Sequence, residues 1–218
     1  VALGDRVGRG YECDMGIRAR SAEACAMSWL EIYGRGVICL PMSWEGIGGR
    51  GLPMMAINIC SRHGAAFSVP IEAGEGGTTG ISAPDRTLTG ATAINEQNSM
   101  AEIAPPGHVF PLRAKRGGVL VRAGHTEAAV DISRLAGLHP SGVIAEFMKE
   151  DGTKARLQGM MDVAAYTGQE IGSTGDQIAQ GPRNNNPRTA LHKRTCNSQF
   201  RPLQEQPRIP NQAPHVSQ

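Results

Sequence analysis

Within residues 1–180 the apolar side chains alternate between two periods, and this alternation limits the folds that the chain can adopt. Short runs that are wholly apolar, or apolar at every second position, are typical of β-strands. These runs occupy residues 37–40, 65–71, 109–112, 119–121 and 143–148. The dipeptide at 151–152, Asp-Gly, favours a tight hairpin that would turn the last run onto residues 153–157.

Three further stretches carry apolar residues at helical spacing. Ser21 is a candidate N-cap for a helix over 22–33. A second helix is expected to begin at Thr126 and to stop at Gly137, and a third to cover 158–166. Strands and helices mix without a fixed repeat, so the pattern predicts an α+β or α/β fold and excludes a solenoid.

The length and composition exclude several classes of protein. The 218 residues suit one domain, or one domain with a tail, and 4% aromatic residues leave a core of aliphatic side chains and Met. No apolar run reaches the roughly 18 residues of a membrane span, and no signal segment opens the chain. The five cysteines are scattered and never spaced Cys-x-x-Cys, which disfavours a zinc cluster and predicts a reducing, cytoplasmic location.

Residues 181–218 differ from the rest of the chain. They hold six basic residues, one acidic residue and six of the 14 prolines, a net charge of +5 against +2 for the whole sequence. Their few apolar residues share no period, so we expect a disordered or loosely draped tail. Such a tail is usually a solvated extension, and with an overall charge of only +2 a nucleic-acid partner is not expected.

Titratable residues gather in glycine-rich turns. Arg122 stands just before the expected helix start at Thr126, and a guanidinium beside free helical N–H groups is suited to a phosphate group. Between them, His125 could give a ring nitrogen to a divalent metal. His108 and Glu146 could supply a base and an acid. Each residue also has a structural interpretation, as a hydrogen-bonded turn histidine or as a glutamate paired with a lysine.

A second glycine-rich segment, residues 76–80, has the sequence Gly-Gly-Thr-Thr-Gly. Backbone amides in such a loop could wrap a phosphate group, with Thr79 as a contact. The same composition is equally typical of a flexible turn.

Five runs of the sequence closely resemble 3,4-dihydroxy-2-butanone-4-phosphate synthase of riboflavin biosynthesis. They are residues 77–86, 106–114, 117–128, 142–146 and 151–156. The resemblance covers roughly residues 1–180, about two dozen family residues are missing upstream of Val1, and the tail matches nothing recognisable. It implies a single α+β domain with a mixed sheet and surrounding helices.

The resemblance also implies a function. The expected reaction is that of a lyase that converts D-ribulose 5-phosphate to 3,4-dihydroxy-2-butanone 4-phosphate and formate with Mg²⁺ or Mn²⁺. The expected assembly is a homodimer with active sites at the subunit interface. The implied metal ligand is His125, and the implied catalytic residues are His108, Glu146 and Asp14. The implied substrate contacts are Arg9, Asp14, Arg122, Gly124, Thr126, Thr79 and Glu146.

The first loop departs from the family. Its pattern is Arg-Glu-Asn-Glu-Gly-Asp-Leu, whereas residues 9–15 here read Arg-Gly-Tyr-Glu-Cys-Asp-Met. Gly10 stands where the family has a glutamate that binds metal, and a hard cation loses a charged oxygen ligand there. Glu12, two residues on, is a hypothetical replacement ligand.

The altered loop leaves two alternatives to an authentic synthase. One is a diverged paralogue that performs a different or partial reaction on a sugar phosphate. The other is a non-catalytic binding or dimerisation homologue. An enzyme is favoured over a binder because His108, Arg122, His125 and Glu146 are all present.

Overall fold

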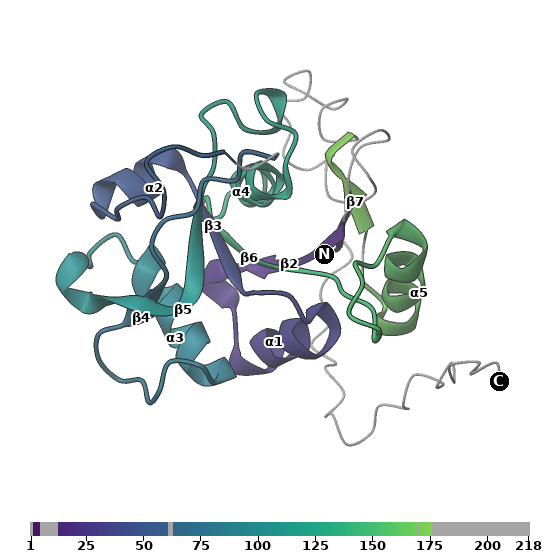
Figure 1. The fold of residues 1–218 in the computed structure, drawn as a ribbon, viewed down its shortest axis with the longest axis horizontal. Coiled ribbons are helices and arrows are strands. Elements are labelled where there is room, and N and C mark those ends of the chain that lie inside the picture. Colours follow the sequence, from purple (N-terminus) through teal and green to yellow (C-terminus); the bar gives the residue numbers. More distant parts are fainter. Residues whose placement is uncertain (1, 5–12, 61–62, 170, 176–218) are drawn as a thin grey trace.

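The computed structural model describes residues 2–4, 13–60, 63–169 and 171–175 (Figure 1). Among these residues one sheet of seven strands has the order β4-β5-β3-β6-β2-β1-β7. The strands are β1 Ala2–Gly4, β2 Cys13–Arg18, β3 Cys39–Met42, β4 Ile71–Ala73, β5 Ile103–Arg113, β6 Gly142–Glu146 and β7 Ile171–Ser173. The pairs β3–β5 and β1–β7 are parallel and the other pairs are antiparallel, so the sheet is mixed, as predicted.

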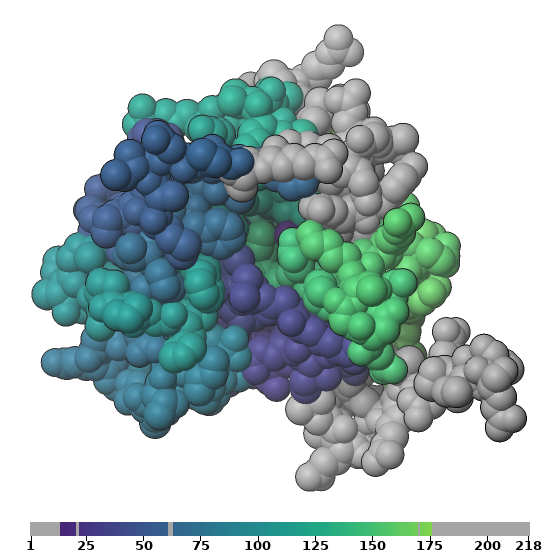
Figure 2. Space-filling model, viewed as in Figure 1, coloured from purple at the N-terminus to yellow at the C-terminus, as the bar shows by residue number. Residues whose placement is uncertain are grey.

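Helices cover both faces of this sheet. They are α1 Ala24–Trp29, α2 Trp44–Gly49, α3 Ala83–Ile94, α4 His125–Leu135 and α5 Leu157–Thr167. In Figure 1, α4 lies on one side of β3, β6 and β2, and α1 and α3 lie on the other. Figure 2 shows the outer surface with α5, in green, beside the α1 segment, in purple. None of the helices in the described part of the chain is long and apolar enough to cross a membrane.

The alternation of side chains along the central strands builds two apolar cores. Leu40 on β3 and Val143 on β6 face the larger core, which also receives Met27 and Leu30 from the α1 region. The next residues along those strands point the other way, and Ile144 packs in the smaller core against α4. Because positions two apart share a face, Glu146 at the end of β6 lies on the α4 side of the sheet.

Several predicted elements are confirmed with small shifts. The apolar run at 143–148 contains β6, and the helix predicted over 158–166 is α5, Leu157–Thr167. Beyond β6, Lys149 N–H donates to the Thr153 carbonyl, which closes the predicted turn at 151–152. The helix expected from Thr126 is α4, but it begins at His125 with Gly124 as N-cap.

The predicted strand at 119–121 is wrong. The chain instead forms a 3₁₀ helix, Gly118–Leu120, and Leu120 and Val121 are 59% and 65% exposed. Two factors outweigh the short apolar run. Gly117 and Gly118 adopt positive φ angles of 92° and 61°, which turn the chain sharply, and the Val119 N–H donates to Asp131 on α4 at 2.9 Å.

The first predicted helix and the strand after it are also displaced. Ser21 is not an N-cap, because α1 begins at Ala24 after Glu23 and continues as a π-helix, Leu30–Gly34. The strand predicted at 37–40 is β3, which extends through Pro41. The Ile38 and Met42 carbonyls accept from the N–H groups of Phe110 and Ala114, so the Pro41 nitrogen points toward β6. Pro41 has no N–H to donate, and on this side β3 is bridged only on either side of it, by Cys39 and Met42.

Of the run predicted at 65–71, Phe67 and Ser68 form only isolated bridges, and the strand β4 begins at Ile71. The run at 109–112 is confirmed as the end of a longer strand, β5. The predicted disordered tail, residues 181–218, lies outside the described residues.

Candidate active site

A cleft of about 490 Å³ opens on the α4 side of the sheet, at the end of β6 and the start of β2 and β3. Its polar wall comes from two places. Asp14 on β2 and Glu146 on β6 are direct neighbours in the strand register. Facing them is the start of α4, with Arg122 and His125 at the cleft wall. The sheet and α4 thus bring together residues more than 100 positions apart in the sequence.

The helix start supplies the features of an anion site. The first helical hydrogen bond of α4 runs from the Ala128 N–H to the Gly124 carbonyl, so the amides of residues 125–127 have no carbonyl partner within the helix. The positive end of the helix dipole lies at the same place. Thr126, which is 5% exposed, and Gly124 both line the cleft.

Arg122 is held beside this helix start from two directions. Its Nε donates to the His63 carbonyl at 3.0 Å, and its Nη1 donates to Oε2 of Glu127 at 2.5 Å. Gly124 is required here because a Cβ would lie 2.3 Å from Nη1 of Arg122. Arg122 and Gly124 therefore fit together only when position 124 has no side chain.

His125 contacts the sheet side of the cleft. Its Nδ1 lies 2.9 Å from Oδ2 of Asp14, and both side chains are about nine-tenths buried. A carboxylate at one ring nitrogen fixes the orientation of an imidazole and favours the tautomer or charge state with a proton at that nitrogen. The contact orients the His125 ring at the point where α4 meets β2.

Glu146 accepts a hydrogen bond from Lys154 Nζ at 2.9 Å, and both side chains are about half exposed. The pairing with a lysine considered from the sequence is therefore present, and Glu146 lines the cleft as well. Lys154 has no role in the sequence interpretation. It comes into reach through the turn after β6, which returns the chain to the cleft.

Cys39 forms part of the cleft floor. Burial, together with the nearby carboxylates of Asp14 and Glu146, raises the pKa of its thiol to about 12. The thiol therefore stays protonated at neutral pH and is unsuited to nucleophilic chemistry or metal binding.

His108 lies apart from this group of residues. It is on β5 and forms an ion pair with Glu72 on β4, at the other end of the sheet. The His108 side chain is 44% exposed and does not line the cleft in this chain. The structure thus brings Asp14, Arg122, His125, Thr126 and Glu146 together and places His108 elsewhere.

The glycine-rich segment at 76–80 is an ordered loop around an internal carboxylate. Asp85 on α3 accepts from the Thr78 N–H at 2.9 Å, the Thr78 hydroxyl at 2.6 Å and the Gly80 N–H at 3.2 Å. These bonds, those from Thr78 first, lower the pKa of Asp85 to about 2. The amides of Thr78 and Gly80 are therefore occupied by Asp85, and Thr79 between them is exposed.

The part of the acidic first loop that precedes β2, with Arg9, Gly10 and Glu12, lies outside the residues that the structure describes. Within the described residues, no group of three or more His, Cys, Asp or Glu side chains is placed to hold a metal ion. Of the predicted metal ligands, only His125 can be located.

The fold and the cleft together define an α+β protein in which the start of a helix, with its free amides, lies opposite two carboxylates. The family model described as 3,4-dihydroxy-2-butanone 4-phosphate synthase matches residues 1–180. The chain belongs to that family, which confirms the resemblance seen in the sequence.

Two named relatives and two solved structures support this assignment. The 3,4-dihydroxy-2-butanone 4-phosphate synthase of Neisseria meningitidis serogroup B is 44% identical over 178 residues, 82% of this chain and 49% of the relative. That of Desulfatibacillum aliphaticivorans is 45% identical over 180 residues, 82% of this chain and 84% of the relative. The chain thus spans about half the length of the first of these relatives.

Among solved structures, a two-domain 3,4-dihydroxy-2-butanone 4-phosphate synthase from A. baumannii has a TM-score of 0.79 and 39% identity, covering 83% of this chain and 53% of that chain. A synthase described as a complex with two magnesium ions has a TM-score of 0.77 and 33% identity, covering 83% and 89%. These similarities confirm the predicted α+β synthase fold.

Proposed function

We propose that this chain cleaves D-ribulose 5-phosphate to 3,4-dihydroxy-2-butanone 4-phosphate and formate. The observation that carries the proposal is the single cleft in which Arg122 and the start of α4 face Asp14 and Glu146 across His125. One wall is suited to a phosphate group and the other to proton transfer, as a reaction on a sugar phosphate requires. Family membership supports the same substrate class.

The phosphate group is bound by Arg122, the amides at the start of α4 and the Thr126 hydroxyl, with Gly124 leaving room for close approach. These donors are buried or nearly so, with the Arg122 side chain 15% exposed. Donors held in a cleft that excludes water bind an anion more strongly than the same groups at a surface. The phosphate contacts fix the position of the carbon chain between α4 and β6.

Proton transfer falls to the carboxylates on the opposite wall. Glu146 is within reach of solvent and of Lys154, so a proton taken from the substrate can be passed on. Asp14 is buried against His125 and orients the substrate hydroxyls and the imidazole together.

A divalent cation, Mg²⁺ or Mn²⁺, completes the site. The fit rests on the chemistry of the donors, with the His125 imidazole oriented at the cleft by Asp14. His125 and Glu12 would hold the ion, with Glu12 substituting for the glutamate that Gly10 replaces. When bound, the ion supplies positive charge beside the substrate oxygens that become negative in the reaction.

His108 and Thr79 act from a second copy of the chain. His108 is exposed on the β4–β5 side of the sheet and does not reach the cleft of its own chain, so a homodimer is the arrangement in which it meets the substrate. Thr79 is exposed in the loop that follows β4. This arrangement makes the cleft an interface between two subunits.

The test is incubation of the protein with D-ribulose 5-phosphate and Mg²⁺, with formate release measured for the wild type and for Gly10→Glu. Release of formate by the wild type supports the proposal, and a large gain in Gly10→Glu shows that the missing carboxylate limits the reaction. No formate from either protein at high enzyme and metal concentration would overturn it. The size of the protein in solution, measured by light scattering, tests the dimer.

A diverged paralogue is the second candidate, and the substitution at Gly10 is the observation that favours it. In that case the phosphate wall is used on a sugar phosphate that undergoes a different or partial reaction. Mass spectrometry of the products separates the two candidates. A product without formate supports the paralogue, and clean conversion to the butanone phosphate excludes it.

A cytoplasmic location accompanies either candidate. The described cysteines Cys25, Cys39 and Cys60 are free thiols, which supports a reducing compartment.

A further inference from the structure

A buried carboxylate stands directly behind the phosphate wall. Glu127, in the first turn of α4, is completely buried. Its Oε1 accepts from the Lys115 N–H at 2.9 Å, and its Oε2 accepts from Arg122 Nη1 at 2.5 Å. Both oxygens are thus used, one by the backbone and one by the guanidinium. Burying a carboxylate is unfavourable unless its charge is paired, and here the only charged group that an ion pair gives it within the described residues is Arg122.

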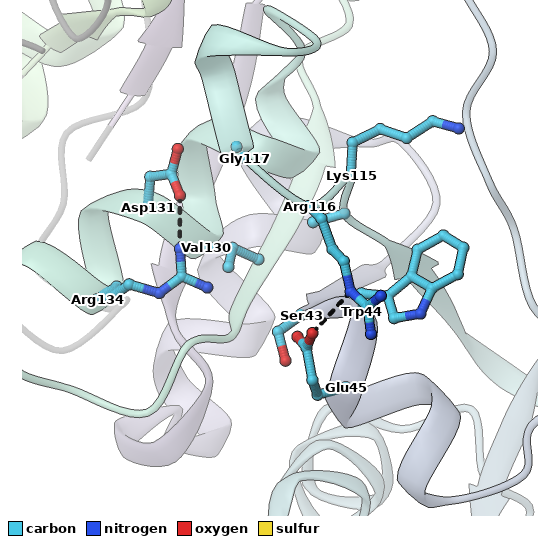
Figure 3. Close-up of a pocket in the computed structure, with 11 residues that line it drawn as sticks. Ser43, Trp44, Glu45, Lys115, Arg116, Gly117, Val130, Asp131 and Arg134 are labelled. Carbon is cyan, nitrogen blue, oxygen red and sulfur yellow. Dashed lines mark hydrogen bonds and ion pairs between the residues drawn. The ribbon is translucent and has the colours of Figure 1, made fainter.

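The segment between β5 and α4 is fixed by hydrogen bonds to two carboxylates of α4. Glu127 holds its start at Lys115, and Asp131, one helical turn further, accepts from the Val119 N–H at 2.9 Å. Figure 3 shows Asp131 with its ion-pair partner Arg134 beside a second cavity of about 160 Å³. The two carboxylates bind the same segment in the same manner, but only Glu127 touches Arg122.

Two of the three nitrogens of the Arg122 guanidinium donate hydrogen bonds within the protein. Nε donates to His63 and Nη1 to Glu127, whereas Nη2 has no partner among the described residues. Because Arg122 lines the cleft, the two N–H groups of Nη2 are left for an anion there, with the second N–H of Nη1 beside them. The direction of Nη2 is set by the other two contacts.

We propose that Glu127 is a positioning residue, which aims Arg122 at the phosphate group of the substrate. The inference rests on the proposed function only for the identity of the substrate. It concerns orientation and not charge, since the carboxylate of Glu127 opposes an anion in the cleft. Glu127 therefore weakens the field at the site while fixing the geometry of the donor.

The negative charge of Glu127 and its orientation of Arg122 predict opposite effects of Glu127→Gln on anion binding. If charge dominated, removing the carboxylate would leave Arg122 unneutralised and would strengthen anion binding. If orientation dominates, a glutamine keeps its one oxygen as the acceptor for the Lys115 N–H and turns its N–H₂ donor toward Arg122, which releases the guanidinium. Anion binding is then weakened despite the greater positive charge.

The experiment measures the dissociation constant of inorganic phosphate by calorimetry, with metal removed by a chelator, for the wild type, Glu127→Gln and Asp131→Asn. We expect a dissociation constant about tenfold higher in Glu127→Gln, which corresponds to one charge-assisted hydrogen bond, and a value within about twofold of the wild type in Asp131→Asn. Circular dichroism confirms the fold of each variant. Equal or tighter phosphate binding in Glu127→Gln, or the same weakening in Asp131→Asn, overturns the proposal.

A second pair of variants tests whether Glu127 affects phosphate binding through Arg122. In an Arg122→Lys background, Glu127→Gln should change phosphate affinity little, because the guanidinium that Glu127 aims is gone. A full tenfold effect in that background means that Glu127 acts by another path and overturns the proposal. If neither Glu127→Gln nor Glu127→Asp folds, Glu127 is a folding residue and the proposal also fails.

Phosphate binding is independent of turnover, so the two proposals can fail separately. Absence of formate with the expected loss of phosphate affinity rejects the lyase activity and leaves the role of Glu127 intact. Where the wild type does release formate, Glu127→Gln should raise the KM for D-ribulose 5-phosphate more than it lowers kcat.

Discussion

His125 Nδ1 lies 2.9 Å from Oδ2 of Asp14, and this contact joins the start of α4 to β2. It is the point at which the helix-start wall of the cleft, the proposed phosphate site, meets the carboxylate wall. The two residues are separated by more than 100 positions in the sequence, so their contact depends on the antiparallel pairing of β2 with β6 and on the packing of α4 over both. The geometry of the reaction site is therefore a property of the sheet as a whole.

Replacing Asp14 by Asn should weaken metal-dependent activity while leaving the fold intact. The amide can still contact His125, but it removes the negative charge that orients the ring and raises its basicity as a ligand. Loss of such a partner commonly costs about 10–100-fold in metal affinity or activity. The measurement is the Mg²⁺ concentration that gives half-maximal formate release. An unchanged Mg²⁺ dependence would show that Asp14 does not act through His125.

Replacing Gly124 by Ala should damage the phosphate wall specifically. The new Cβ would lie 2.3 Å from Arg122 Nη1 and 2.9 Å from Glu127 Oε2, so the Arg122–Glu127 pair must separate. We expect phosphate affinity to fall by about tenfold and stability to fall by about 1–3 kcal/mol.

The matched control for that variant is Gly48→Ala. A Cβ at Gly48 in α2 meets nothing within 4 Å, so the same chemical change introduces no contact there. Its stability should rise by about 0.5–1 kcal/mol through helix propensity, with unaltered phosphate binding. Calorimetric titration and urea unfolding check both variants. Equal phosphate affinity in the two would refute the steric argument.

Stability should depend on pH through Asp85. Its folded pKa is lowered from 3.8 to about 2 by the bonds from Thr78, Ser82 and Gly80. A group with a lowered folded pKa stabilises the protein above its unfolded pKa, and this contribution is lost as pH falls through the folded pKa. Asp85→Asn should therefore lower stability at pH 7, and its difference from the wild type should shrink between 3.8 and about 2.

Urea unfolding at a series of pH values measures this difference. Asp162→Asn is the control, because among the described residues Asp162 accepts only from the exposed Gln158 side chain on α5. The same chemical change at this exposed position should alter stability at pH 7 by no more than about 0.5 kcal/mol. A constant difference between Asp85→Asn and the wild type from pH 7 down to pH 2 would contradict the assignment.

The sequence predicted the parts of the site that are local in the chain. Arg122, Gly124, His125 and Thr126 lie within five positions, and a helix start fixes their relation, so their convergence follows from recognising one helix. The strand β6 was equally clear because a wholly apolar run buried on both faces has few alternatives.

The wrong strand, and the contacts that were not foreseen, arise where distant residues decide the local structure. The 3₁₀ helix at Gly118–Leu120 depends on Asp131 on the following helix, which no short-range pattern reveals. The pairing of His108 with Glu72 depends on the β4–β5 register across 36 positions. Glu127 was visible in the motif, but its proposed role rests on its complete burial and on its contacts with Lys115 and Arg122.

The short spacing of Arg122, Gly124, Thr126 and Glu127 has an evolutionary consequence. In the proposed site a segment of six residues binds the phosphate group, whereas the residues that transfer protons come from separate strands. Under that proposal a substitution elsewhere, such as the glycine at position 10, can change the reaction of a bound sugar phosphate without abolishing its binding. Substrate binding and catalysis can in this sense evolve separately. Under the proposal, a lineage can exchange one reaction for another while the class of ligand that it binds stays the same.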